Sequence, residues 1–175
     1  MELWDCYDKN QVTQKDILLV RGKPIQDGQY HLVVHACLFN NNNEMLIQKR
    51  QANKNIFPGL WDFSVGGSAL TGENIHQAMQ RETREEIGLE LNFSLVQPAM
   101  MMTFDHGFDY YFVGKIRESI EELKIQKEEV QEVCFASLES IEKLLEEKKF
   151  VPYKKSFVEL LFACLDGYGE WSKKV

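Results

Sequence analysis

The segment between Asn74 and Gly88 constrains the fold most strongly, because it has the periodicity of an amphipathic helix. Apolar residues or threonine recur at every fourth position and predict the face that packs on a core: Ile75, Met79, Thr83 and Ile87. Glycine is the residue type that most often follows the end of a helix. The helix is therefore expected to cover Asn74–Ile87 and to stop at Gly88.

Three glutamates of this helix are crowded together. Glu85 and Glu86 follow Glu82 by three and four positions, so the three side chains meet on one face, beside the apolar stripe. Carboxylates packed beside a core repel one another and lose hydration. A divalent cation removes both penalties, and Mg²⁺ prefers carboxylate oxygens together with water and phosphate. From these residues alone, a solvated face paired with Arg81 and Arg84 is an equal alternative.

Strand signals flank the helix on both sides. The clearest is a hairpin, Tyr30–Phe39 and Glu44–Arg50, joined by four asparagines that favour a turn. Further strands are expected at Leu60–Val65, Leu91–Phe104, Asp109–Ile116 and Val130–Leu138. Two more helices are expected: one within Ser137–Lys149, capped by Ser137 or Ser140, and one opened by Pro152 and closed by Gly167. Strands interleaved with helices favour an α/β or α+β fold, with helices covering a mixed sheet.

The residues around the first helix match a longer pattern. Gly67 is followed after five residues by Glu73, and after seven more by the run Arg81–Leu89. Residues Gly67–Leu89 thereby resemble the box of the Nudix hydrolases, G-x5-E-x7-R-E-U-x-E-E-x-G-U, with Thr83 as a soft departure at an aliphatic position. Because every fixed position is present at the set spacing, the signal is specific.

The resemblance extends to the order of strands and helices over about Tyr30–Gly167. It implies an α/β (α+β) fold, a Nudix-type α/β/α sandwich around a mixed β-sheet. We expect residues 1–29 to form an N-terminal arm packed on the domain, and residues 30–175 to form the Nudix hydrolase domain, giving a single domain in all.

The resemblance also implies metal ligands. Glu82, Glu85 and Glu86 would bind Mg²⁺ (or Mn²⁺), and Glu85 or Glu86 would take the proton of the attacking water. The backbone carbonyl of Gly67 would approach a metal without a side chain in the way. Family members often add a glutamate from a distant loop; Glu129 is the candidate here.

Supporting roles follow from the same resemblance. Arg81 would hold a glutamate in orientation by a bidentate pair, and Glu73 would be a catalytic-site carboxylate behind the ligands. Glu128 rivals Glu129 for the distant metal position, and the charged stretch around both is otherwise expected to be solvated surface.

Arg50 and Lys54 lie near the end of the expected hairpin and could bind a terminal phosphate, or else form a solvated surface pair. His31 and His35 share one face of a strand and are expected to be packed or hydrogen-bonded. Five aromatic residues could stack on a base, although more of them are expected in the core: Trp61, Phe63, Phe104, Phe108 and Tyr110.

A second resemblance concerns residues His31–Gly67, which are similar to the corresponding region of isopentenyl-diphosphate isomerase, an enzyme with a Nudix-type fold. The isomerase needs a cysteine where this chain has Gly66, and metal-binding histidines where it has Ser68 and Pro24. A glycine cannot protonate an alkene. The resemblance therefore implies a hydrolase of the isomerase-like branch.

The composition limits the classes of partner that this chain is expected to bind. The formal net charge of -7 disfavours non-specific binding to nucleic acid or to an anionic membrane. The four cysteines form no C-x-x-C pair, and no signal peptide or membrane span is evident, so a reduced, cytoplasmic protein is expected. The arm and the apolar segment Met100–Phe104 could serve a homodimer.

The leading hypothesis is a Mg²⁺- or Mn²⁺-dependent pyrophosphohydrolase acting on a small-molecule diphosphate, in particular a nucleoside diphosphate linked to another moiety. The alternatives are isopentenyl-diphosphate delta-isomerase, disfavoured by Gly66, and a catalytically silent nucleotide-sensing module. The leaving group is set by loops, and loop chemistry is not legible in one chain.

Overall fold

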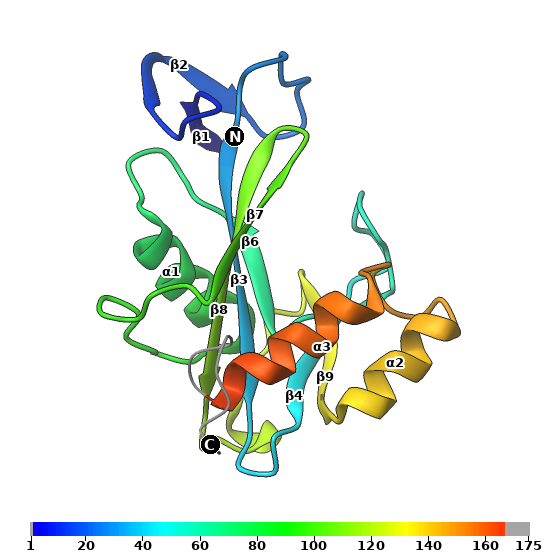
Figure 1. Cartoon of the computed structure of the whole chain (residues 1–175). Coiled ribbons are helices and arrows are strands. Elements are labelled where there is room, and N and C mark those ends of the chain that lie inside the picture. The colour runs from blue at the N-terminus through cyan, green and yellow to red at the C-terminus, as the bar shows by residue number, and fades with distance from the viewer. Residues whose placement is uncertain (1, 167–175) are drawn as a thin grey trace, which may run out of the picture.

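The centre of the fold is a mixed sheet, which the computed structural model describes within residues 2–166 (Figure 1). Its strands within that range are β3 (His31–Phe39), β4 (Met45–Arg50), β5 (Trp61–Asp62), β6 (Val65–Ser68), β7 (Met100–Phe104), β8 (Gly107–Lys115) and β9 (Val130–Ala136). The order β5-β4-β3-β8-β7 runs across the sheet, while β6 also pairs with β3 and β9 with β4. β3 and β8 are parallel, and the other pairs are antiparallel.

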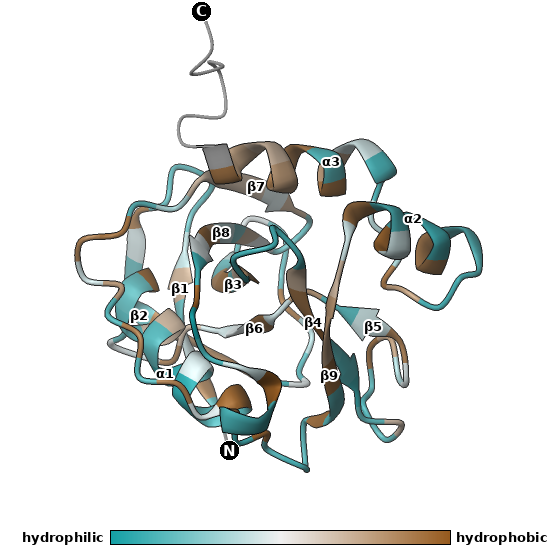
Figure 2. Cartoon of the chain, turned by 90° about the horizontal axis from the view of Figure 1, so that it is seen from below, coloured by the Kyte–Doolittle hydropathy of each residue, from teal (hydrophilic) through white to brown (hydrophobic). Residues whose placement is uncertain are grey.

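Helices cover both faces of this sheet. The end view in Figure 2 places β3, β4, β6 and β8 between α1 (Ile75–Ile87) on one side and α3 (Lys155–Ala163) on the other, with α2 (Leu138–Glu146) next to α3. Side chains of β3 alternate between the two cores: Val34 packs with Met79 of α1, whereas Phe39 packs with Leu161 of α3. The expected α/β/α sandwich around a mixed sheet is confirmed.

The sequence determines both ends of α1. Asn74 caps the N-terminus by accepting hydrogen bonds from the backbone of His76 and Gln77, and the Gln77 side chain accepts one from the Asn74 backbone N–H. Gly88 ends the helix in the left-handed conformation, with φ of 73°. The predicted helix is confirmed, and most of the predicted apolar stripe is buried. Ile75 is half-buried, whereas Glu86 is buried.

A separate two-stranded sheet forms the N-terminal arm. It consists of β1 (Leu3–Tyr7) and β2 (Thr13–Val20) and lies at one end of the main sheet (Figure 1). β1 contacts the loop that precedes α1: Thr71 N donates to Leu3 O at 2.9 Å, and Gly72 N donates to the Asp5 carboxylate at 2.9 Å. Trp4 of the arm stacks on His31, with ring centroids 4.2 Å apart.

The expected hairpin pairs only at its turn, where Phe39 opposes Met45. Beyond that point β4 pairs with β5 and β9, and β6 takes its place beside β3. The single strand expected over Leu60–Val65 is wrong, because this segment is divided into β5 and β6. The break falls at Ser64, whose hydroxyl accepts from Leu38 N and donates to Leu46 O.

Two further expectations are corrected. The strand expected from Leu91 begins only at Met100, because Asn92 accepts hydrogen bonds from the backbone and hydroxyl of Ser94 and makes a turn there. The last helix begins at Lys155, not Pro152, since the preceding segment is extended and Val151 N donates to Trp61 O.

The remaining features of the fold concern the ends of α2 and α3. Ser137 is the cap of α2, and α3 is followed by a short 3-10 turn, Cys164–Asp166. The expected stop at Gly167 lies outside the described residues. No helix within residues 2–166 is long and apolar enough to cross a membrane.

Candidate functional site

Glu82 of α1 lies directly against β6. The side chain is half-buried, and a β-carbon built on Gly67 would lie only 2.0 Å from Glu82 Oε1. Any residue larger than glycine at position 67 would therefore collide with the carboxylate. Burial raises the pKa of Glu82 to about 7, while the charge of Arg81 acts in the opposite direction.

Arg81 is the hub of the carboxylate cluster. It makes the predicted bidentate pair, with Glu73 as its partner, at 2.8 Å from Nε and 3.0 Å from Nη2. Its Nη1 also donates to Glu82 at 2.8 Å and to Glu85 at 3.0 Å, and Nη2 donates to Ser68 O at 3.0 Å. Burial alone would raise the pKa of Glu73, but the hydrogen bonds from Arg81 and from Leu70 N, together with the charge of Arg81, outweigh it and lower that pKa.

Glu86 is held differently, without a cationic partner among the described residues. Its side chain is buried, and Oε2 accepts from Gln48 Nε2 at 2.9 Å and from Gly66 N at 3.1 Å. Burial and the charge of nearby Glu82 raise the pKa of Glu86 to about 8, against the effect of the two hydrogen bonds. A carboxylate in this position costs free energy unless a cation approaches it.

Each of the three glutamates uses one oxygen for its protein partner. Arg81 takes Oε1 of Glu82 and Oε2 of Glu85, whereas Gln48 takes Oε2 of Glu86. The second oxygen of each carboxylate accepts no hydrogen bond from another residue within 2–166. Three oriented carboxylates, each with one oxygen uncommitted, are therefore available to a ligand.

A divalent cation fits the chemistry of this set, although no preformed cage exists. Within residues 2–166, no group of three histidine, cysteine, aspartate or glutamate side chains is arranged to hold a metal ion as it stands. Arg81 contributes to this, because its guanidinium binds both Glu82 and Glu85. The donors are nonetheless hard oxygens, the space at Gly67 accommodates Glu82, and Glu86 lacks a cation of its own.

Lys54 and Glu129 form an ion pair with each other, which joins the loop after β4 to the loop before β9. Gln51 strengthens this connection, since its backbone N donates to Glu129 O at 3.0 Å. Burial lowers the pKa of Lys54, whereas the charges of Glu86 and Glu82 raise it. Both predicted residues thus lie at the edge of the carboxylate cluster, bound to one another.

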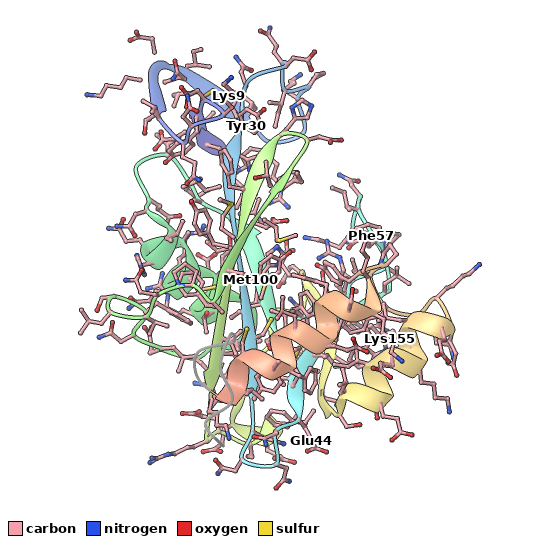
Figure 3. The ribbon with its side chains drawn as sticks, in the orientation of Figure 1. Lys9, Tyr30, Glu44, Phe57, Met100 and Lys155 are labelled. Carbon is pink, nitrogen blue, oxygen red and sulfur yellow. The ribbon has the colours of Figure 1, made fainter. Side chains whose placement is uncertain are left out.

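The guanidinium of Arg50 binds other protein groups, one in the same loop and one on β5. Its Nη1 donates to Asp62 at 3.0 Å, and its Nε donates to Ile56 O at 3.2 Å. Tyr153 donates to the second oxygen of Asp62 at 3.1 Å. Arg50 is therefore not the solvated surface pair that was the alternative expectation. Figure 3 shows Phe57 on this loop, where it is exposed.

The histidines and aromatic residues behave mainly as packing groups. His35 binds Asp109 at 3.2 Å and stacks on Tyr111, and His31 is buried against Trp4. The five aromatic candidates divide by exposure: Phe63 and Phe108 are buried, Trp61 and Tyr110 are half-buried, and Phe104 is exposed.

Sequence reasoning missed Gln48. The residue is 4% exposed in a strand whose other central residues are apolar. A glutamine inside the run MLIQKR is a signal of a buried polar contact, because an amide is rarely buried without a partner. The identity of that partner depends on α1, 38 residues further along the chain, and could not be read locally.

Comparison with known proteins identifies relatives of this chain. A family model described as NUDIX domain matches residues 29–161. A Nudix hydrolase of Listeria innocua is 41% identical over 155 residues, which cover 87% of this chain and 90% of the relative. An isopentenyl-diphosphate Delta-isomerase of Klebsiella pneumoniae is 36% identical over 74 residues, which cover 42% of this chain and 40% of the relative.

Solved structures show the same fold. A crystal structure from Deinococcus radiodurans matches with a TM-score of 0.75 at 20% identity, covering 93% of this chain and 99% of that one. The NUDIX domain of Shewanella oneidensis NrtR, complexed with ADP ribose, matches with a TM-score of 0.53 at 18% identity, covering 65% and 77%. At these identities the likeness concerns the fold alone.

Proposed function

The chain belongs to the NUDIX family, and we propose that it is a hydrolase, dependent on Mg²⁺ or Mn²⁺, that cleaves the diphosphate linkage of a nucleoside diphosphate joined to another moiety. Hydrolysis of pyrophosphate bonds in general is the activity of the family, and its members generally use divalent metal cations. The specific substrate of this chain and the role of each residue belong to the proposal.

One observation carries the proposal: Glu82, Glu85 and Glu86 each keep one carboxylate oxygen uncommitted while the other is held by the protein. A structural ion-pair cluster would commit both oxygens of a half-buried carboxylate, as Arg81 does with Glu73. The arrangement supports a site that awaits a cation and, with it, the phosphates of a substrate.

The chain's own residues divide the work. Glu82, Glu85 and Glu86 would hold the cation, which when bound neutralises the diphosphate charge and lowers the pKa of a coordinated water. Glu85 or Glu86 would accept a proton from the attacking water. Arg81 orients Glu82 and Glu85, and Glu73 in turn fixes Arg81.

Residues at the edge of the cluster would complete the site. Glu129 is proposed as a further carboxylate for the cation, and Lys54 as a contact for the terminal phosphate; each must first leave the ion pair that joins them. Arg50, whose Nε and Nη1 bind Ile56 and Asp62, is proposed as a further contact for that phosphate. The nucleotide assignment is supported by the related NUDIX domain complexed with ADP ribose.

An isomerase is the second candidate, favoured by the similarity to isopentenyl-diphosphate Delta-isomerase over less than half of the chain. The local geometry opposes it. A β-carbon on Gly66 would lie 2.8 Å from Nδ1 of His35, which Asp109 and Tyr111 hold in place, so this position has little room for a cysteine. Conversion of isopentenyl diphosphate to its dimethylallyl isomer would reverse this ranking.

A panel of diphosphate compounds tests the proposal. Wild-type protein, supplied with Mg²⁺ or Mn²⁺, is expected to release phosphate or a nucleotide from at least one nucleoside diphosphate derivative, and EDTA is expected to stop the release. Glu86→Gln is expected to lower kcat by at least about 100-fold, because it removes a carboxylate charge from the site. Glu90→Gln, an exposed position just beyond α1, is the matched control and should retain wild-type turnover.

Two outcomes would contradict the proposal. The first is full turnover by the folded Glu86→Gln variant. The second is nucleotide binding with no hydrolysis by the wild type across the panel, which would instead favour the catalytically silent sensing module.

A further inference from the structure

We propose that Gln48 is a positioning residue that fixes the carboxylate of Glu86 and leaves its Oε1 available to a cation, which Glu86 would help to hold. Gln48 does not belong to the motif that surrounds α1. It lies on β4, and its hydrogen bond to Glu86 joins two elements far apart in sequence. The inference rests on the proposed function and adds a residue to its machinery.

The hydrogen bond between Gln48 and Glu86 forms where β4 has separated from β3. β3 and β4 pair only at Phe39 and Met45, after which β6 occupies the edge of β3. Ser64 bridges the two separating strands, accepting from Leu38 N at 2.8 Å and donating to Leu46 O at 2.5 Å. β4 and β6 are not paired with each other, and each supplies a hydrogen-bond donor to Glu86.

Glu86 reaches these two donors from the side of α1. Along β4, Ile47 packs in the core beneath α3, whereas Leu46 packs in the core beneath α1, so alternation directs Gln48 towards α1. Gln48 Nε2 on one strand and Gly66 N on the other both donate to the same atom, Glu86 Oε2. Two donors on one oxygen fix the plane of the carboxylate and leave Oε1 uncommitted.

The uncharged amide of Gln48 matters as much as the position of this residue on β4. An amide holds a carboxylate by a hydrogen bond without neutralising its charge. Arg81, by contrast, partly neutralises Glu82 and Glu85. Gln48 therefore restricts the orientation of Glu86 without adding a positive charge that would compete with a divalent cation, as a supporting partner of a metal ligand should.

Mn²⁺ binding to the metal-free protein tests the inference without relying on turnover, with unbound Mn²⁺ measured by its EPR signal. Gln48→Met keeps the length of the side chain and removes the donor. It is expected to raise the Kd for Mn²⁺ about 10- to 100-fold and to lower kcat by a similar factor, with KM changed less than about 2-fold. Gln131→Met, at an exposed position of neighbouring β9, is the control and should behave as wild type.

A second variant separates positioning from mere structural support. Gln48→Lys restores a donor to Glu86 but adds a positive charge beside it. We expect this variant to unfold in urea at or above the concentration found for Gln48→Met, yet to bind Mn²⁺ no better. If Gln48 only supported the fold, Mn²⁺ binding would recover together with stability, and the inference would be overturned.

The outcomes distinguish the two proposals. Wild-type Kd and kcat in folded Gln48→Met would overturn the role of Gln48 and leave the proposed hydrolase intact. Failure of the wild-type protein itself to bind Mn²⁺ or to hydrolyse any diphosphate would overturn the proposed function, and the inference with it.

Discussion

Gly67 of β6 lies directly beside the carboxylate of Glu82. Its backbone φ is not in the left-handed region, so alanine is compatible with the local conformation. The obstacle is the predicted collision of the new methyl group with Glu82, at 2.0 Å. The residue thus matters for the placement of a neighbouring side chain, in addition to the exposed carbonyl that the family resemblance implies.

Gly67→Ala is therefore expected to displace Glu82 and to lower kcat/KM about 10- to 100-fold, while the protein remains folded. Gly114→Ala is the matched control, because a β-carbon there meets no atom within 4 Å. Steady-state kinetics and urea unfolding of both variants provide the comparison. Equal activity of the two variants would show that Glu82 is not needed where the structure places it.

Arg81 provides the second test at the residue scale. Its guanidinium makes five hydrogen bonds in total, which an ammonium cannot reproduce. Arg81→Lys is expected to lower the free energy of unfolding by about 1–3 kcal/mol and to reduce activity, because Glu73 and its neighbours lose their partner. Arg84→Lys, exposed on the same helix, should change neither. An unaltered unfolding midpoint for Arg81→Lys would contradict the role of Arg81 as a hub.

At the scale of elements, α1 is the part of the fold that local chemistry specifies most completely. Its range, most of its buried face and its final glycine could be predicted within Asn74–Gly88, and the structure adds Asn74 as the cap. Asn74→Ala is expected to destabilise the protein by about 1 kcal/mol, whereas Asn74→Asp keeps the capping oxygen and should cost less. Urea unfolding at neutral pH measures the difference, and no loss in Asn74→Ala would show that tertiary packing alone holds the helix start.

Other elements were predicted less well, for reasons that lie outside the local sequence. The run Leu60–Val65 has the composition of one strand, but Ser64 binds the backbones of two other strands and divides it. The hairpin separates after Phe39 because β6 competes for the same edge of β3. Local propensity cannot reveal such competition between distant segments.

The candidate site shows the same division. Glu82, Glu85 and Glu86 could be recognised from spacing within one helix, and Glu73 and Gly67 from the longer motif. The contact between Gln48 and Glu86, and the commitment of Arg50 to Asp62, depend on how strands are arranged in space. Spacing in the sequence predicted that the carboxylates gather on one helix, whereas the partners that hold them required the structure.

On the scale of the whole molecule, the N-terminal arm is tied to the domain beside α1, through backbone contacts at Thr71 and the stacking of Trp4 on His31. We propose that residues 1–29 act as an arm on a domain formed by residues 30–175. The pKa of His31 is lowered to about 4, mainly by burial; the charge of Asp109 acts against this lowering and His106 acts with it. His31 is therefore neutral where the arm docks.

This burial predicts a pH dependence of stability. The folded-state pKa of His31 lies below the ordinary value, so between pH 7 and pH 5 the unfolded chain takes up a proton that the folded protein does not. Stability should fall over that interval by about 1–2 kcal/mol on account of His31. His31→Phe keeps a ring against Trp4 and should lose correspondingly less, as measured by urea unfolding at both pH values. Equal losses in the two proteins would contradict the assignment.

The position of Mn²⁺ in crystals of the wild-type protein tests the central claim most directly, by anomalous diffraction at the manganese edge. We expect an anomalous peak within coordination distance of carboxylate oxygens of Glu82, Glu85 and Glu86, about 2.2 Å from the nearest. A peak only at other positions, with these three carboxylates still bound to Arg81 and Gln48 or turned towards solvent, would contradict it.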